Sequence, residues 1–159
     1  MALLIIILTG VDVIVVCHSM VDLNKILAGQ ICPYCKCETI LVSDKDIYGQ
    51  NSTYGGMYFK CINNSDHYVG TYKKDKRSLG RLADKELRTW KMKGHEAFDP
   101  LWEGENRYFM NQKTAYIWLS NAMQLELEYT HFGMFTIEQC QSAILLCSNL
   151  KNEHNGNIR

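Results

Sequence analysis

Four cysteine and histidine side chains have the spacing of a metal site. Cys32 and Cys35 form a C-x-x-C pair, and Cys61 and His67 form a second pair later in the chain. Two thiolates at the first spacing can face one corner of a tetrahedron, since the chain has room to curl round an ion after the first cysteine. Four sulfur and nitrogen ligands complete the closed shell that structural zinc prefers. We therefore expect these four side chains to hold one structural Zn²⁺ ion.

Two other interpretations of this pattern stay open. Cys37, two residues beyond Cys35, could compete for one ligand position, although a C-x-C spacing usually directs the second thiol away from the cluster. His67 could instead be a surface histidine, which would leave the site with three ligands. A redox role for the C-x-x-C pair is disfavoured, because no thioredoxin-like βαβ pattern surrounds it.

Short β-prone runs flank the proposed ligands. They comprise residues 39–42, 57–60 and 68–72, and segments rich in Asp, Asn, Ser and Gly separate them. This alternation predicts a small antiparallel sheet of three or four strands within residues 30–78. A sheet of that size buries little apolar area on its own, so it needs a metal staple or a partner.

The sequence period becomes helical beyond residue 79. Asp84, Asn111 and Thr136 can each cap a helix, Gln139 completes a capping box with Thr136, and Pro100 ends the first helix. We therefore predict an α+β protein in which a zinc-stapled, zinc-ribbon-like antiparallel β module, residues 30–78, packs against a three-helix segment, residues 79–150. The polar residues 151–159 are expected to form a disordered tail.

The overall composition excludes several classes of protein. The 159 residues carry 17 basic and 17 acidic side chains and are 47% hydrophobic, which excludes collagen, a coiled coil, wholesale disorder and a highly basic nucleic-acid scaffold. Seven cysteines are too few, and odd in number, for a disulfide-dense secreted scaffold. Cys140 and Cys147 share a helical face with Ile137 and Ile144, so we expect them to be buried apolar side chains and not ligands.

Residues 1–29 form an apolar N-terminal extension with three open interpretations. Translation could begin at Met20, the extension could be a weak membrane anchor, or it could form a buried strand. Asp12 interrupts the apolar run, the first basic residue is Lys25, and no good cleavage site follows, so a spanning helix and a signal peptide are disfavoured. We therefore expect a cytoplasmic protein without a membrane partner, whose clustered cysteines hold metal in a reducing compartment.

The balanced net charge conceals an uneven distribution. Residues 60–93 contain ten basic and four acidic side chains, whereas residues 94–138 contain two basic and seven acidic ones. Cations beside aromatic rings are typical of surfaces that bind single-stranded DNA or RNA, and the alternative is a solvated face above a small tyrosine core. The candidate nucleic-acid-binding residues are Lys60, Lys73, Lys74, Lys76, Arg77, Arg81 and Arg88.

A series of short motifs is distributed along the chain between Cys32 and Cys147. They are Cys32-Pro33-Tyr34-Cys35, Tyr48-Gly49, Tyr54-Gly55-Gly56-Met57, Tyr68-Val69-Gly70, Leu79-Gly80, Leu82-Ala83-Asp84, Glu86-Leu87-Arg88, His95, Ala97-Phe98-Asp99-Pro100-Leu101-Trp102, Ala115-Tyr116-Ile117-Trp118-Leu119 and His131-Phe132-Gly133-Met134-Phe135. With these motifs the chain resembles the zinc-finger-containing domain family of phage, prophage and bacterial proteins, a family without an assigned activity. The resemblance implies zinc binding by the first module. His67 stands where the family usually has a cysteine, and both residue types are competent zinc ligands.

Together these features predict a non-enzymatic, zinc-binding accessory protein that binds nucleic acid or a nucleic-acid-processing complex. A protein-interaction adaptor, with the zinc module and the acidic helical half as its docking surfaces, is one alternative. A metal-dependent hydrolase is another, because His95 and Asp99 would share a helix face four residues apart and His131 could join them. The same spacing equally predicts a structural histidine–carboxylate hydrogen bond just before Pro100, and we favour that interpretation.

Overall fold

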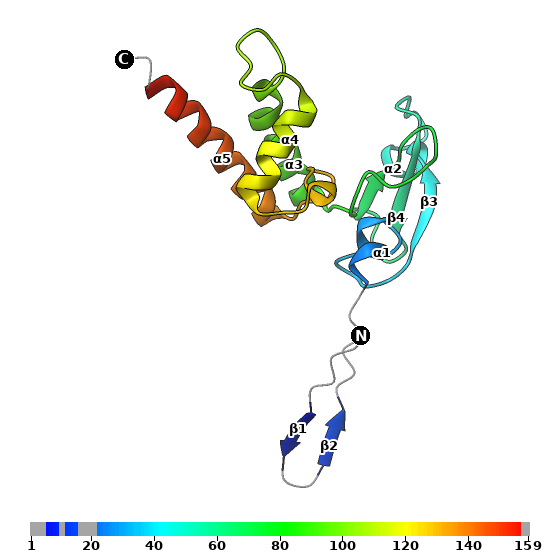
Figure 1. Ribbon diagram of the computed structural model, residues 1–159. Helices are drawn as coiled ribbons and strands as arrows, with labels where there is room; N and C mark the ends of the chain where they lie inside the picture. The colour runs from blue at the N-terminus through cyan, green and yellow to red at the C-terminus, as the bar shows by residue number, and fades with distance from the viewer. Residues whose placement is uncertain (1–5, 10–11, 16–21, 157–159) are drawn as a thin grey trace.

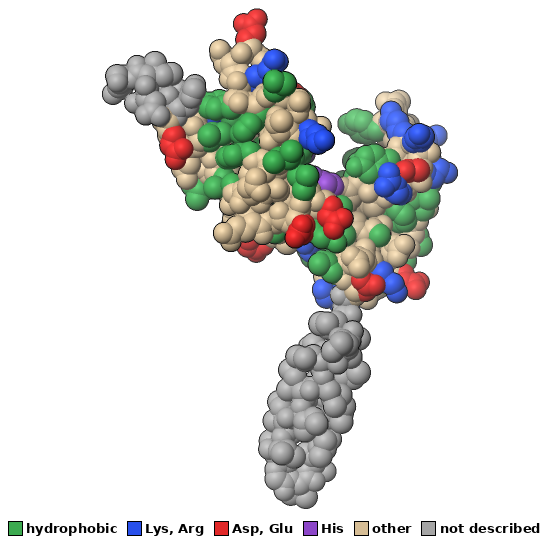
Figure 2. Space-filling view, in the orientation of Figure 1, with side chains coloured by type: hydrophobic (Ala, Val, Ile, Leu, Met, Phe, Trp, Pro, Cys, Tyr) green, Lys and Arg blue, Asp and Glu red, His purple; other side chains and the backbone are tan. Residues whose placement is uncertain are grey.

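The molecule consists of two lobes that meet near residue 84 (Figure 1). The computed structural model describes residues 6–9, 12–15 and 22–156, with side chains from residue 22 to residue 153. The N-terminal lobe, residues 22–83, contains a three-stranded sheet and two short helices, and the helical lobe, residues 84–156, contains three longer helices. The predicted α+β class is therefore confirmed. A hollow separates the two lobes in the space-filling view (Figure 2).

The N-terminal extension contains a pair of short strands. β1 (Ile6–Thr9) and β2 (Asp12–Val15) are antiparallel, with Ile6 opposite Val15. The side chains of these two strands lie outside the described residues, as do residues 16–21, which include Met20. The three interpretations of the extension, a start at Met20, a weak anchor and a buried strand, depend on those parts of the chain. In the part of the chain that the structure describes, no helix has both the length and the apolar character needed to cross a membrane.

An antiparallel sheet forms the framework of the N-terminal lobe. Its strands, in spatial order, are β3 (Thr39–Ser43), β4 (Met57–Cys61) and β5 (Tyr68–Gly70). Phe59 stands opposite Val69, and Lys60 stands opposite Tyr68. Because side chains alternate across a strand, Phe59 and Val69 face a small buried core, whereas Tyr58, Lys60 and Tyr68 share the other face.

The segment after β3 forms a short helix where the sequence predicts a turn. In α2 (Asp44–Tyr48), Ser43 donates to the Asp46 carboxylate from its backbone N–H at 3.1 Å and from Oγ at 2.8 Å. Asp44 is buried and accepts hydrogen bonds from Ser52 Oγ at 2.8 Å and from Gly55 N at 2.9 Å. These bonds attach the following loop to the helix, so α2 depends on residues up to Gly55, well beyond the polar segment that follows β3.

Three capped helices build the helical lobe. They are α3 (Lys85–Phe98), α4 (Gln112–Met123) and α5 (Ile137–Gly156), with 3-10 turns η1 (Asp99–Leu101) and η2 (Leu127–Tyr129). Asp84 and Asn111 each accept a hydrogen bond from a backbone amide three residues later, at 2.8 and 3.0 Å. Thr136 and Gln139 exchange bonds at 2.9 and 3.3 Å. The three predicted helix starts are confirmed.

The core of the helical lobe extends along α5 as far as Leu150. Cys140 and Cys147 are fully buried in it, as predicted for apolar side chains. Residues 151–156 continue α5, so the prediction of a disordered tail is wrong for them, and residues 157–159 lie outside the described residues. Lys151 Nζ donates to Ala97 O at 3.1 Å, and this bond attaches the last turns to α3. A polar composition does not reveal such a contact.

Two glycines allow the lobes to approach closely, and we call their contact the glycine junction. A Cβ atom on Gly133 would lie 1.9 Å from Leu79 O, and one on Gly80 would lie 2.1 Å from Gly133 O. Gly133 O also accepts hydrogen bonds from Arg81 N at 3.1 Å and from Lys91 Nζ at 2.8 Å. No other residue type fits between these backbones, so the junction fixes the separation of the two lobes.

Candidate metal centre

Cys32 and Cys35 lie in a tight turn between α1 (Leu23–Leu27) and β3. Cys32 N donates to Cys37 O at 2.8 Å, and Lys36 N donates to Cys32 O at 2.9 Å. Lys36 has a φ of 57°, and Cys35 N donates to Cys32 Sγ at 3.4 Å. We call residues 31–38 the cysteine turn. Its curled backbone directs both thiols to one point, as the C-x-x-C spacing predicts.

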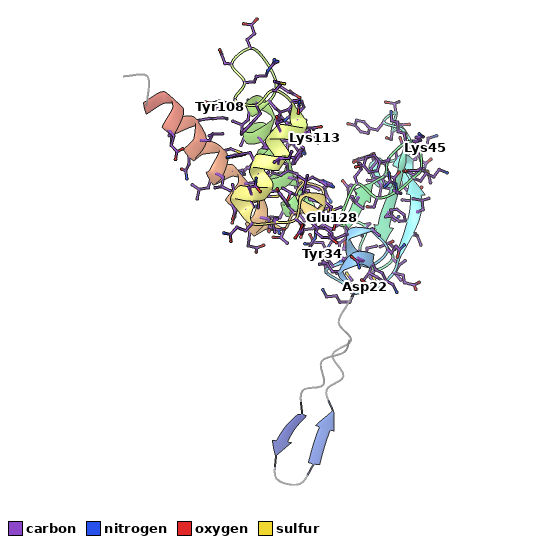
Figure 3. The ribbon with its side chains drawn as sticks, in the orientation of Figure 1. Asp22, Tyr34, Lys45, Tyr108, Lys113 and Glu128 are labelled. Carbon is purple, nitrogen blue, oxygen red and sulfur yellow. The ribbon has the colours of Figure 1, made fainter. Side chains whose placement is uncertain are left out.

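Cys61 and His67 reach the same point through the connection between β4 and β5. Cys61 ends β4, and its backbone N–H donates to His67 O at 2.9 Å. The His67 ring packs against Tyr34, with centroids 4.4 Å apart, and its Nε2 lies 3.2 Å from Asn64 Nδ2. Tyr34 in turn accepts a hydrogen bond from Asp84 N at 3.2 Å, where the lobes meet (Figure 3). These contacts hold the ring with Nδ1 toward the thiols.

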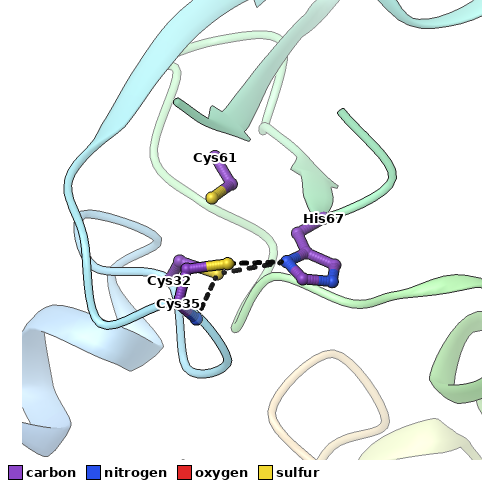
Figure 4. Close-up of side chains that lie close together, drawn as sticks. All are labelled: Cys32, Cys35, Cys61 and His67. Atoms are coloured by element: carbon purple, nitrogen blue, oxygen red, sulfur yellow. Dashed lines mark hydrogen bonds between the residues drawn. The ribbon is translucent and has the colours of Figure 1, made fainter. Parts of the chain in front are cut away.

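The geometry of the four side chains fits a zinc ion. Their ligand atoms all lie within 4.8 Å of one another, and His67 Nδ1 is 3.5 Å from both Cys32 Sγ and Cys35 Sγ (Figure 4). Tetrahedral zinc, with bonds of about 2.3 Å to sulfur and about 2.0–2.1 Å to nitrogen, holds such atoms about 3.5 Å apart. Cys32 and Cys61 are buried, with 0% and 2% of their surface exposed. Separations, donor types and burial therefore agree with a structural site.

Crowding of the thiols changes their acidity. Burial, together with the neighbouring thiols of Cys61 and Cys32, raises the pKa of Cys35 to about 12. Burial also opposes ionisation of Cys61, but hydrogen bonds from Cys37 and from the backbone of the following turn lower the pKa of Cys61 overall. Several thiolates held this closely repel one another, and a divalent cation removes that cost because it binds the ionised form.

Cys37 touches the cluster although it stands outside the group of four. Its Sγ lies 3.3 Å from Cys61 Sγ, so the thiol does not project away as the C-x-C spacing suggests. The left-handed φ of Lys36 turns the chain back along the cluster after Cys35. Cys37 is therefore placed to contact the sulfur of Cys61 from outside the ligand set.

A second turn repeats the backbone of the cysteine turn. In residues 71–78, which we call the basic turn, Tyr72 N donates to Arg77 O at 2.8 Å and Lys76 N donates to Tyr72 O at 3.0 Å. Lys76 has a φ of 56°, and an antiparallel bridge joins the first and last residues of each turn. Tyr72 and Asp75 take the places of the two cysteines. The sequence does not reveal this similarity, because only the cysteine turn carries the C-x-x-C signal.

Four of the seven candidate nucleic-acid-binding residues lie on the basic turn. Lys73, Lys74, Lys76 and Arg77 are all exposed there. Arg77 donates from Nε to Asp75 Oδ2 at 2.6 Å and from its backbone N–H to Oδ1 at 3.1 Å. This pair closes the turn where the cysteine turn would have a metal.

The other three candidates are less available to a ligand. Lys60 is half-buried on the sheet face that carries the tyrosines. Arg88 pairs with the Asp66 carboxylate, donates to two backbone carbonyls at 2.6 Å, and lies 4.1 Å from the centroid of the Tyr68 ring. Arg81 is half-buried, and its Nε has no hydrogen-bond partner among the described residues. The exposed lysines of the basic turn, Lys73, Lys74 and Lys76, are thus more available to a ligand than Arg88.

The residues of the hydrolase alternative form structural contacts, and among the described residues they do not gather into a metal-binding group. His95 Nδ1 and Asp99 Oδ2 are 3.2 Å apart at the end of α3, as expected for a structural pair. His131 Nδ1 accepts a hydrogen bond from Gly133 N at 3.0 Å. Within residues 22–153, the cluster of Cys32 is the one group of three or more Cys, His, Asp or Glu side chains that could hold a metal ion.

Comparisons with known proteins agree with this site. The sequence matches a family described as a zinc-finger-containing domain over residues 28–150, a range that includes all four candidate ligands. The chain matches no curated protein and no solved structure. The family match and the cluster of three cysteines and one histidine together identify a zinc-binding protein.

Proposed function

We propose that this chain, which belongs to the zinc-finger-containing domain family, is a non-enzymatic accessory protein that binds single-stranded nucleic acid, alone or within a nucleic-acid-processing complex. In this proposal one zinc ion per chain has a structural role, held by Cys32, Cys35, Cys61 and His67. Four protein ligands leave no open position for a substrate or an activated water, which is the arrangement of structural zinc. Three thiolate ligands also favour a reducing compartment, such as the cytoplasm.

The basic turn is the observation that carries the nucleic-acid part of this proposal. Four cations occur within residues 73–77, and the hydrogen bonds of the turn hold their backbone in one conformation. Cations on an ordered turn lose less entropy on contact with phosphates than cations on a flexible loop. Tyr72, which is 46% exposed, lies in the same turn. Cations beside an exposed ring suit a strand whose bases are unpaired.

Removal of two cations from the basic turn should reduce the salt dependence of binding. Each phosphate contact to a single strand contributes about 0.7 to the slope of log affinity against log salt concentration. The Lys74→Gln/Lys76→Gln variant should therefore show a slope shallower by about 1.4. Fluorescence anisotropy with short labelled DNA and RNA strands, between about 50 and 200 mM salt, measures this slope on the zinc-loaded chain.

A matched control separates the basic turn from general charge. Lys25 and Lys93 are exposed lysines outside the basic turn, on α1 and α3, so Lys25→Gln/Lys93→Gln removes the same charge elsewhere and should keep the wild-type slope. An equal change in both variants would argue against the basic turn. If the zinc-loaded chain binds neither strand at low salt, the proposal fails, and the adaptor with its acidic helical surface becomes the better explanation.

A further inference from the structure

A cleft of about 810 Å³ lies between the sheet of the N-terminal lobe and helix α3. Figure 2 shows this hollow, with a histidine side chain between the lobes. Its volume is within the range of about 300–1,000 Å³ that is usual for small-ligand sites. Tyrosines line the sheet side, α3 contributes Arg88, Lys91 and His95, and residues 131–133 line the region near the glycine junction. None of the residues that line the cleft is Asp or Glu.

The sheet side of the cleft is a cluster of aromatic rings. The Tyr48 centroid lies 5.0 Å from that of Tyr54, 5.6 Å from that of Tyr58 and 6.0 Å from that of Tyr68, all in edge-to-face contact. Tyr54 is 74% exposed, and the residue opposite Tyr58 on β5 is Gly70, which has no side chain to cover the ring. The cleft therefore offers ring surface to a planar ligand.

The helical side of the cleft is positively charged. Lys91 Nζ donates to Gly133 O at 2.8 Å and to Arg81 O at 3.4 Å, which leaves one of its three N–H groups for a further acceptor. Lys73 lines the cleft from the basic turn, whereas the charge of Arg88 is paired with the Asp66 carboxylate. Lys91 and Lys73, with no carboxylate among the lining residues, favour an anionic ligand.

The cleft exists before any ligand binds, because the glycine junction holds the lobes apart at a fixed distance. In α3, Gly94 packs directly under the Phe132 ring, where a Cβ atom would lie 2.2 Å from Cε1. This close packing anchors residues 131–133 to the same helix that carries Lys91. A preformed site avoids the entropic cost of ordering its walls on binding.

We propose that this cleft holds one unpaired nucleotide of a bound single strand, with its base against the tyrosine rings and its phosphate near Lys91 and Lys73. The inference rests on the proposed function, because the basic turn brings Lys73 to the rim of the same cleft. Tyrosine clusters also accommodate quaternary ammonium ligands. The cations of this cleft repel a quaternary ammonium group, so the positive charge favours a ligand that carries a phosphate.

Binding should weaken as the pH rises above about 8. Burial lowers the pKa of Lys91 to about 8, the charges of Arg81 and Arg88 act in the same direction, and Cys140 opposes them. The affinity should fall by up to about tenfold per pH unit above that value, since the charged lysine is the form that binds phosphate. Burial and the Lys91 charge lower the pKa of His131, so it adds positive charge only in acid. Lys91→Gln should flatten the anisotropy profile, and a flat wild-type profile up to about pH 9.5 contradicts the role of Lys91.

The Tyr54 side chain gives the sharpest test, because it is 74% exposed and its removal should therefore disturb the fold little. Stacking of one base on an aromatic ring contributes enough for truncation to weaken binding roughly 5- to 100-fold. We expect that loss in Tyr54→Ala, with no change in the salt slope, whereas Tyr54→Phe keeps the ring and the affinity. Tyr129→Ala removes an exposed tyrosine on η2, outside the cleft, and should bind like the wild type.

Anisotropy with labelled DNA and RNA strands distinguishes the possible results. A loss confined to Tyr54→Ala supports the inference, and the strand that shows it identifies the sugar that the cleft accepts. If Tyr54→Ala binds both strands with wild-type affinity, the cleft inference is overturned. If Lys74→Gln/Lys76→Gln still reduces the salt slope in that case, the proposed function remains supported. Absence of binding by the wild type overturns both.

Discussion

Removal of zinc should unfold the N-terminal lobe and leave the helical lobe folded. The buried core of the N-terminal lobe around the sheet consists of Cys32, Cys61, Val69 and Leu82, so half of its members belong to the candidate metal site. Apolar burial on this scale cannot hold three strands together. Structural zinc contributes about 10–16 kcal/mol of apparent free energy in peptide sites, which is as large as the total stability of about 5–15 kcal/mol of a typical domain.

The helical lobe has an independent core, which makes the expected response selective. Its fully buried members include Phe98, Leu119, Phe132 and Phe135. All three tryptophans of the chain lie in this lobe, at positions 90, 102 and 118. Tryptophan emission should therefore stay that of a folded environment after treatment with a strong chelator, while amide hydrogen exchange accelerates throughout β3, β4 and β5.

The Cys61→Ser variant serves as the control for chelation. It should show fast exchange in the same three strands without chelator, and the chelator should change it no further. Re-addition of zinc should restore protection in the wild type alone. Sheet amides that stay protected in the metal-free wild type would contradict a structural role for the ion.

Replacement of Gly133 by alanine should cost about 3 kcal/mol of stability, at the upper end of the range for overpacked sites. The new Cβ atom would lie 1.9 Å from Leu79 O and 2.6 Å from His131 Cε1, and neither neighbour is the free end of a flexible side chain. The lobes would have to separate, which would also break the bond from Arg81 N to Gly133 O. Because 1 kcal/mol shifts the melting temperature of a chain of this size by about 2–4 °C, we expect a decrease of roughly 6–12 °C by calorimetry.

Gly104→Ala is the matched control for this substitution. Gly104 has a φ of 82°, but no atom lies within 4 Å of the position of an added Cβ. Its replacement should cost about 1 kcal/mol through backbone strain alone. If Gly133→Ala is no less stable than Gly104→Ala, the glycine junction does not control the separation of the lobes.

Local patterns predicted the parts of the fold that depend on few residues. The C-x-x-C spacing and the paired Cys61 and His67 suffice to predict that four side chains meet, because the strands between them leave little freedom. The helix starts at Asp84 and Asn111 follow from caps that act within one turn. Cys140 could be assigned to the core from helical periodicity alone.

Features that depend on distant contacts were missed or misplaced. Helix α2 forms because Asp44 binds a loop that begins several residues later, and the end of α5 is held by Ala97 O. In the sequence, Lys91 resembles any lysine on the solvated face of a helix. Its hydrogen bond to Gly133 O, 42 residues later in the chain, appears only in the structure. The cleft is invisible in the sequence for the same reason, since its two sides belong to different lobes.

Elemental analysis of the purified chain, beside its Cys37→Ser and Cys61→Ser variants, tests the central claim most directly. The two thiols lie 3.3 Å apart, but Cys61 alone belongs to the group of four. We expect one zinc per chain in the wild type and in Cys37→Ser, and loss of zinc in Cys61→Ser. A wild-type chain with an intact sheet and no zinc, or retention of zinc by Cys61→Ser, would contradict the account.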